Sequence, residues 1–354
     1  RLVFGFKSSK AKQMLSRSIG IDLGTASVIV YVDGKGVLLK EPSVVAVDER
    51  TNPKTVVAVG ADAKRMIGRT PGSITAVRPI KDGVIADFDV TAAMLKKFIK
   101  QALHGSIFTR VRIMICVPAG VTEVESRAVY DAAKTAGAAE IDLLEEPMAA
   151  AVGAGLPIWD AAGNMVADIG GGTTDVAVIS LGDIVTSQSL RMAGDDLDNA
   201  IIQYVKRKHN LLIGERSAEQ IKIEIGSALP YEDEKVIEVR GRNLVDGLPK
   251  KINISSAEVR EAMGDVIRQI VDTVRITLEN TPPELSSDII DRGITLTGGT
   301  SLLRGLAELI ARETGMPVQI APNPIDCVVL GTAKRLDGSS GFENYVFRQV
   351  KRFR

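Results

Sequence analysis

A short motif occurs twice in the sequence, 146 residues apart. The segment from Ile19 to Val30 aligns with the segment from Met165 to Val178 when the second copy is allowed two extra glycines. In each copy an apolar run ends in an aspartate, a glycine and threonine turn follows, and β-branched residues resume, which predicts a β-hairpin. Two such hairpins indicate two related domains, and 354 residues suffice for two or three.

The chemistry of this hairpin suits a nucleoside triphosphate. Glycine allows backbone N–H groups to approach phosphate oxygens, threonine adds a hydroxyl donor, and a tight turn forms an anion nest. A carboxylate beside the nest needs a cation between it and the phosphate, so we expect Asp22 and Asp168 to be outer ligands of Mg²⁺. The candidate phosphate-binding residues are Gly24, Thr25 and Ala26 in the first turn and Gly170, Gly171, Gly172 and Thr173 in the second. A plain turn with a capping aspartate is the alternative.

Two further segments are candidates for contacts with the nucleoside. An apolar strand over 293–297 runs into Gly298 and Gly299, and we expect a helix over 302–314 to follow. A Ser-x-x-Gln capping box at Ser217 predicts a helix start that puts Glu219 and Lys222 on one face. A surface ion pair between Glu219 and Lys222 is the alternative to a binding role.

The periodicity predicts an α/β fold with mixed sheets covered by helices. The expected strands are 19–23, 28–32, 36–39, 111–117, 165–169, 175–180, 184–190 and 293–297. The expected helices run from about Val90 to Leu103, from Thr122, over 196–208 and over 302–314.

Charge is distributed unevenly along the chain. Lysine plus arginine equals aspartate plus glutamate, but residues 1–18 and 341–354 are basic, which leaves residues 19–340 with a net charge of −8. This negative charge predicts that residues 19–340 repel nucleic acid. Two distant cysteines suit a reducing cytosol, no apolar run is long enough to span a bilayer, and no secretory leader is evident. We therefore expect a cytoplasmic protein that does not bind nucleic acid.

Taken together, these motifs resemble the superfamily of actin, sugar kinases and heat-shock chaperone ATPases. Phrases such as VRPIKDGVIADFD (77–89), LLEEPMAAAVGAGLPI (143–158) and DIGGGTTDVAVISLGDIV (168–185) are similar to MreB-type bacterial actins, and the resemblance covers residues 19–336. It implies an actin-like ATPase fold of two related mixed-sheet domains and four subdomains around a central nucleotide cleft. It also implies ATP or ADP with Mg²⁺, slow hydrolysis coupled to polymerisation into filaments, and a role in bacterial cell shape with partner proteins.

The expected domain organisation follows from this resemblance. Residues 19–160 form domain I and residues 161–336 form domain II, with the C-terminal helix returning to domain I. Residues 1–18 form a basic N-terminal segment, and residues 337–354 form a linker and a basic amphipathic tail.

The resemblance also implies two residues that act in hydrolysis. Glu125 corresponds to the glutamate that orients the attacking water, and Thr174 to a hydroxyl near the γ-phosphate. The residues leave another role open for Glu125, because Thr122-Glu-Val-Glu125 is itself a capping box. Asp175 stands where many relatives have glutamate, and Ser27-Val28 where they commonly have Asn-Thr, so the hydrolysis rate is the property most affected.

The ends of the chain favour contact with an anionic membrane. Residues 342–353 have an apolar stripe at helical spacing opposite Arg348, Lys351 and Arg352, the pattern of an interfacial helix. A docked or unstructured tail is the alternative. The N-terminal segment is a weaker candidate anchor, and Ile107-Phe108 resembles a membrane-contacting loop of MreB-type proteins. The expected location is the inner face of the cell membrane.

Two other functions remain open from the sequence. A small-molecule kinase of the same superfamily would use an aspartate base such as Asp87 or Asp89, although no added substrate domain is evident. A chaperone ATPase is less favoured, because only about 50 residues follow Gly299, too few for a peptide-binding domain.

Overall fold

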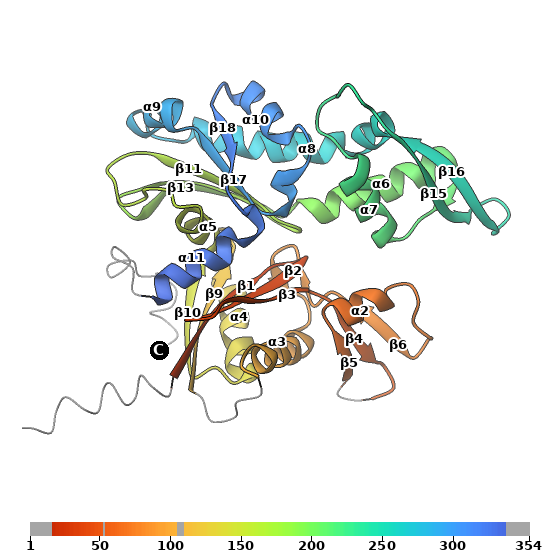
Figure 1. The fold of residues 1–354 in the computed structure, drawn as a ribbon, viewed down its shortest axis with the longest axis horizontal. Helices are drawn as coiled ribbons and strands as arrows, with labels where there is room; N and C mark the ends of the chain where they lie inside the picture. Colours follow the sequence, from red (N-terminus) through yellow and green to blue (C-terminus); the bar gives the residue numbers. More distant parts are fainter. Residues whose placement is uncertain (1–15, 52–53, 105–109, 338–354) are drawn as a thin grey trace, which may run out of the picture. The chain divides into compact units, whose positions relative to one another are not determined.

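The computed structural model describes residues 16–51, 54–104 and 110–337. The chain divides into two compact units, each described by itself (Figure 1). Unit 1 contains the residues up to Gly153 and those from Val328 onwards, and unit 2 is the continuous segment Ala154–Cys327. The sequence placed the corresponding boundaries after residues 160 and 336.

The segments with predicted membrane contacts fall mainly outside this description. Residues 1–15, the pair Ile107-Phe108 and the tail 341–354 are not among the described residues. Within the described ranges, no helix has the length and apolar character needed to cross a bilayer.

Unit 1 is built on a five-stranded mixed sheet with the strand order β10-β9-β1-β2-β3. β1, β2 and β3 form an antiparallel meander, while β9 runs parallel to β1 and β10 parallel to β9. The strands are β1 (Ser16–Leu23), β2 (Ser27–Val32), β3 (Gly36–Pro42), β9 (Arg110–Val117) and β10 (Glu140–Glu145). Four of them confirm predicted strands, and β10 is additional.

Helices cover both faces of this sheet. α3 and α4 share a core with Ile21 of β1. Successive strand residues face opposite ways, so Gly20 lies on the other face, where a Cβ would be 2.0 Å from Oγ1 of Thr332 in α11. A Cβ on Gly331 would likewise be 2.0 Å from a carbonyl oxygen of α5. α11 therefore packs on unit 1. The helices are α3 (Phe88–Ala102), α4 (Glu123–Ala136), α5 (Glu146–Gly153) and α11 (Cys327–Leu336).

A small sheet with the order β5-β4-β6 completes unit 1, together with helix α2 and a two-stranded hairpin. Val44, Ala46 and Ala63 form its separate small core. The elements are β4 (Val45–Asp48), β5 (Thr55–Val59), α2 (Ala61–Met66), β6 (Ile74–Val77), β7 (Ile80–Lys81) and β8 (Val84–Ile85).

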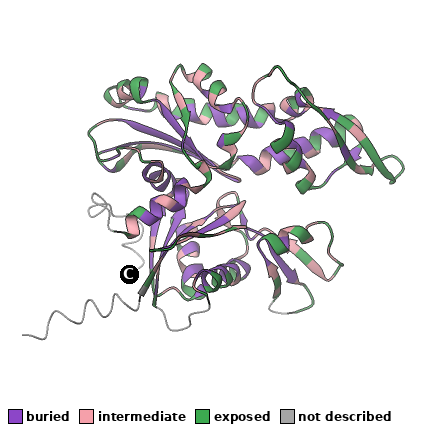
Figure 2. Ribbon diagram, in the orientation of Figure 1, coloured by how far each residue is buried: buried purple, intermediate pink, exposed green. Residues whose placement is uncertain are grey.

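Unit 2 repeats this plan. Its five-stranded sheet has the order β13-β12-β11-β17-β18, with an antiparallel meander β11-β12-β13 and β17 parallel to β11. β11 and β12 are buried along their whole lengths, because helices cover the sheet (Figure 2). The strands are β11 (Asn164–Ile169), β12 (Thr174–Ser180), β13 (Asp183–Leu190), β17 (Ile294–Thr297) and β18 (Val318–Ile320).

A three-stranded sheet, β14-β15-β16, forms the second part of unit 2. Each unit thus combines a large and a small sheet, as four subdomains require. The remaining elements are α6 (Gly194–His209), β14 (Leu211–Leu212), α7 (Glu215–Ile225), β15 (Val236–Asn243), β16 (Pro249–Ser255), α8 (Ser256–Glu279), α9 (Pro283–Arg292), η1 (Gly299–Leu302), α10 (Leu306–Thr314) and η2 (Pro324–Asp326).

Two predicted helix starts are wrong. The helix expected over 302–314 begins at Leu306, after the 3₁₀ turn η1, because Gly305 has φ 76°, a left-handed conformation that interrupts a helix. The helix expected from Ser217 begins at Glu215, and Gly214 occupies its N-cap without a side-chain hydrogen bond. The predicted capping box at Ser217 therefore does not form.

Candidate functional site

The two predicted hairpins exist and their turns have the same length. The last paired residues are Leu23 with Val28 and Ile169 with Thr174, so four residues, 24–27 and 170–173, connect the paired parts of each hairpin. In both, the N–H of the first glycine donates to the carbonyl of the fourth turn residue, from Gly24 to Ser27 at 3.1 Å and from Gly170 to Thr173 at 2.9 Å. The two-glycine gap in the sequence alignment is wrong, because strand pairing fixes the register. Thr25 corresponds to Gly171, not to Thr173.

A hydroxyl group holds each turn at the same carbonyl. Ser43 Oγ donates to the Gly24 oxygen at 2.6 Å, and Thr300 Oγ1 donates to the Gly170 oxygen at 2.6 Å. Thr25 of the first turn is buried, and its Oγ1 accepts a hydrogen bond from the Gly83 N–H at 3.0 Å. These contacts fix the backbone of both turns within their own units.

Asp168 is buried and lies one residue before the end of β11. Thr297 Oγ1 donates to its Oδ1 at 2.7 Å, and Asp175 is its partner on β12. Burial raises the pKa of Asp168 to about 7, the Thr297 hydrogen bond acts in the opposite direction, and the charge of Asp175 adds to the rise. Asp22, its counterpart in unit 1, is half-buried and faces Ile29 across the strand pair.

The first turn of α6 lies against the glycine turn of unit 2. The N–H of Gly194 donates to the Gly170 oxygen at 3.3 Å, and the N–H of Asp195 donates to the Gly171 oxygen at 2.7 Å. Thr174 is fully buried, and its hydroxyl donates to the Met192 oxygen at 2.9 Å. A contact of Thr174 with a phosphate would require this bond to break.

The third glycine motif lies directly on the end of β11. Gly298 has φ 80°, and a Cβ on it would be 2.3 Å from the Ile169 oxygen. A Cβ on Gly299 would have Ile325 as its nearest neighbour, at 3.9 Å. Gly298 is therefore required by a close backbone approach, and the structure brings this motif together with the turn at 170–173.

Lys222 forms an ion pair with a residue that the sequence did not predict. Its Nζ lies 2.9 Å from Asp198 Oδ1 and donates to the Gly194 oxygen at 2.7 Å. Both side chains are largely buried, so the alternative of a surface ion pair between Lys222 and Glu219 is wrong. Burial raises the pKa of Asp198 to about 6, and Lys222 opposes the rise. An acid on the apolar face of a helix, between Leu197 and Ile201, is the signal that could have identified Asp198.

Glu125 takes part in the capping box that was its alternative role. Its Oε2 accepts a hydrogen bond from the Thr122 N–H at 2.8 Å, and its own N–H donates to Thr122 Oγ1 at 3.2 Å. This places the Glu125 carboxylate at the first turn of α4.

The donor set fits a magnesium ion bound mainly by water and phosphate. Among residues 16–51, 54–104 and 110–337, no cluster of three or more metal-binding side chains occurs. Mg²⁺ commonly takes one or two carboxylates and keeps several waters, so single aspartates at the strand ends suit it. Asp168 must be ionised for this role, which its burial disfavours.

Comparisons with known proteins place the chain among bacterial actins. A family model described as MreB/Mbl protein matches residues 16–343. The cell shape-determining protein Mbl of Bacillus subtilis (strain 168) is 54% identical over 324 residues, covering 92% of this chain and 97% of that protein. The cell shape-determining protein MreB of Escherichia coli (strain K12) is 54% identical over 332 residues, covering 93% of this chain and 95% of that protein.

Solved structures agree with the predicted actin-like fold. MreB5 of Spiroplasma citri bound to ADP superposes with a TM-score of 0.86 at 39% identity, covering 93% of this chain and 99% of that chain. The same protein bound to AMPPNP gives a TM-score of 0.85 and covers 96% and 99%. A MamK double helical filament gives 0.77 at 21% identity, covers 91% and 99%, and supports the fold alone.

Proposed function

The chain belongs to the MreB/Mbl family, and from this premise we propose that it is a cytoskeletal protein that binds ATP or ADP with Mg²⁺ and polymerises into filaments. These filaments govern bacterial cell shape at the inner face of the cell membrane, together with partner proteins. Two relatives at 54% identity are named cell shape-determining proteins, which supports this role over that of a small-molecule kinase. The observation that carries the proposal is the repeated hairpin, in which the first glycine of each turn donates the same backbone hydrogen bond.

The turns at 24–27 and 170–173 bind the phosphates through backbone N–H groups. Bound Mg²⁺ would neutralise phosphate charge, and Asp22 and Asp168 would accept hydrogen bonds from its water ligands. Gly298, Gly299, Glu219 and Lys222 contact the nucleoside. Two structures of a relative at 39% identity hold ADP and AMPPNP, which supports nucleotide binding.

Hydrolysis is slow in this proposal and follows assembly. Glu125 orients a water molecule for in-line attack on the γ-phosphate, and Thr174 lies near that phosphate. Glu125 also caps α4, so part of its hydrogen-bonding capacity is used to hold the helix start. We infer that the competition between capping and water orientation keeps turnover low.

Sedimentation and electron microscopy test the assembly. The full chain should form pelletable filaments with Mg-ATP above a critical concentration. Asp168→Ala should weaken filament formation with Mg-ATP. Asp265→Asn, which changes an exposed acid on α8, should leave filament formation intact. Monomeric behaviour with Mg-ATP at all concentrations and salt conditions would contradict the cytoskeletal role, and a phosphorylated small-molecule product would favour the kinase.

The role of Glu125 can be separated from capping. Glu125→Gln keeps an oxygen that can accept the Thr122 N–H, but it loses the charge that orients water. Thr122→Ala removes the other half of the cap and keeps Glu125, at a cost of about 1 kcal/mol in stability. We expect phosphate release to fall at least about tenfold in Glu125→Gln only. Equal turnover of Glu125→Gln and the parent would leave Glu125 with the capping role alone.

Membrane association is proposed through the tail 341–354, with residues 1–18 and Ile107-Phe108 as further anchors. Binding to anionic vesicles should fall with salt and should fall substantially when residues 341–354 are deleted. Equal sedimentation of the deletion variant with those vesicles would refute the tail as an anchor.

A further inference from the structure

Helix α3 has two chemically distinct sides. One side, including Phe98 and Ile99, is buried in the core of unit 1. The other side exposes Lys96, Lys97 and Lys100 to solvent. At 3.6 residues per turn these three lysines fall within about 100° of one another around the helix axis. We call them the α3 lysine row.

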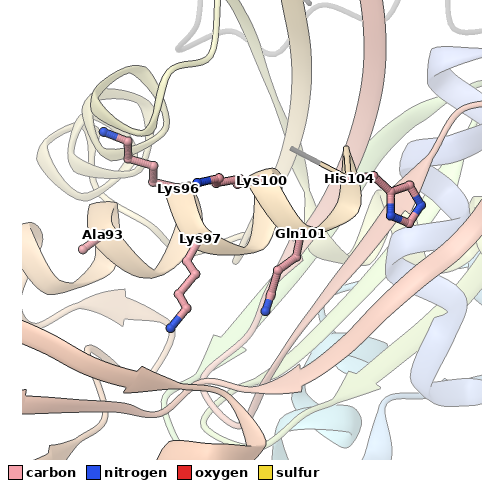
Figure 3. A pocket seen from close by; sticks show the side chains of 6 residues that line it. All are labelled: Ala93, Lys96, Lys97, Lys100, Gln101 and His104. Carbon is pink, nitrogen blue, oxygen red and sulfur yellow. The ribbon is translucent and has the colours of Figure 1, made fainter. Parts of the chain in front are cut away.

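The α3 lysine row borders a shallow groove of about 660 Å³. Ala93, Gln101 and His104 complete its described lining, so no carboxylate is among the described residues that line it. Figure 3 shows the side chains spreading from the helix, with Lys96 on one side and Lys97 and Gln101 on the other. The charges are therefore distributed over a broad surface rather than focused on one point.

The lysines of the α3 lysine row have no acidic partner among the described residues, in contrast to several other cations. Arg112, Lys222 and Arg260 each form an ion pair with a carboxylate. Within the described ranges, no ion pair joins a carboxylate to a lysine of the α3 lysine row. The single acidic residue of α3 is Asp89, in the first turn of the helix. The row thus presents an uncompensated positive field, although residues 19–340 carry a net charge of −8.

We propose that the α3 lysine row is a docking site for the anionic head groups of a phospholipid bilayer. The inference rests on the proposed membrane association and adds to it a site on a folded helix. Lysine is a strongly hydrated point charge that attracts an anionic surface without a fixed geometry. A broad row of point charges suits the diffuse charge of such a surface.

The same observations disfavour nucleic acid as the ligand. The row offers no arginine fork for bidentate phosphate contacts and no aromatic ring for base stacking. A bilayer meets one face of the protein, whereas a long polyanion also experiences the negative charge of the remaining body. The favoured partner is therefore an anionic lipid surface.

A charge-matched pair of variants tests this site. The first is Lys96→Gln/Lys97→Gln/Lys100→Gln in the full chain. The control, Lys206→Gln/Lys235→Gln/Lys250→Gln, removes three exposed charges from unit 2 and changes the net charge equally. A third variant, Lys96→Arg/Lys97→Arg/Lys100→Arg, keeps the charge of the row. Co-sedimentation uses phosphatidylglycerol vesicles and phosphatidylcholine vesicles, with protein above and below the critical concentration for filaments.

Each lysine near an anionic surface strengthens binding about fivefold, so the first variant should bind phosphatidylglycerol vesicles at least about tenfold more weakly than the parent. The control should lose much less, the arginine variant should retain binding, and none should bind phosphatidylcholine vesicles strongly. Measurement below the critical concentration removes any contribution from lost assembly.

The opposite results are equally clear. Equal losses in the first variant and the control would show that only net charge matters, and would overturn the site. Unchanged binding of the first variant, while deletion of residues 341–354 abolishes it, would overturn the site and leave membrane association intact. Absence of vesicle binding by the parent would overturn both. Loss of DNA binding without loss of vesicle binding would assign the row to a polyanion.

Discussion

The hairpin β1-β2 in unit 1 and the hairpin β11-β12 in unit 2 share one backbone design but differ in charge environment. Both turns close through the same glycine hydrogen bond and are held by a hydroxyl at the same carbonyl. Across the strands, however, Asp22 faces Ile29 and Asp168 faces Asp175. Asp168 is also the more buried aspartate, and its pKa rises to about 7. The difference teaches that a repeated backbone can keep its geometry while its packing sets the chemistry of each copy.

The largest expected effect comes from removing the two aspartates separately. Asp168→Ala should weaken Mg-nucleotide binding by about 10- to 100-fold, the range for residues that orient metal ligands. Asp22→Ala should cost less, because water can reach the half-buried position of Asp22 and replace its carboxylate. Calorimetric titration with Mg-ATP measures both. A greater loss of Mg-nucleotide binding from Asp22→Ala than from Asp168→Ala would contradict the larger role assigned to Asp168.

The next effect concerns the glycine that supports the second hairpin. Gly298→Ala should destabilise unit 2 by about 2–4 kcal/mol, because the added Cβ meets the Ile169 oxygen and the backbone has a left-handed φ. Gly299→Ala is the matched control, since its Cβ has ordinary space. Urea unfolding of both variants provides the measurement, and equal stabilities would mean that the turn at 298 adapts without cost.

A smaller, pH-dependent effect should come from Asp198, which supports only the second hairpin through Lys222 and Gly194. Its folded-state pKa, about 6, lies above the ordinary value of 3.8 for an aspartate, so the folded protein retains this proton to a higher pH than the unfolded chain. This group therefore lowers stability as pH rises, by about 1 kcal/mol between pH 5 and pH 7. The stability difference between the parent and Asp198→Asn should change by that amount in urea unfolding at the two pH values. A constant difference would contradict the raised pKa.

The smallest effect tests the shared design itself. Ser43→Ala and Thr300→Ala each remove the hydroxyl that donates to the first glycine carbonyl of one turn. Each should cost about 1 kcal/mol of unfolding free energy, and Thr300→Ala somewhat less, since the Gly194 N–H also donates to the Gly170 oxygen. Unfolding curves that differ by several kcal/mol would show that the two turns are held by different forces.

Local patterns predicted the parts of this molecule that depend on neighbours in sequence. The hairpins at Asp22 and Asp168 and the capping box at Thr122 formed because their donors and acceptors lie within a few residues. The partner of Lys222 was missed because Asp198 comes from another helix, and only packing brings the two together. The two-glycine gap in the hairpin alignment is wrong because strand pairing gives both turns the same length, whereas the threonines stand at different turn positions.

The contact of α11 with β1 has a consequence for synthesis on the ribosome. Unit 2 is one continuous segment, whereas unit 1 is closed by residues from both sides of it. Thr332 packs on Gly20, and Gly331 packs on α5. Both contacts are too close for a larger residue at either glycine. Since domains generally fold as units during translation, unit 2 can complete its core first, while the sheet face of unit 1 around Gly20 stays incompletely covered until α11 emerges. A nascent chain stalled before residue 327 should therefore expose the face around Gly20 to chaperones, and one stalled well beyond residue 336 should not.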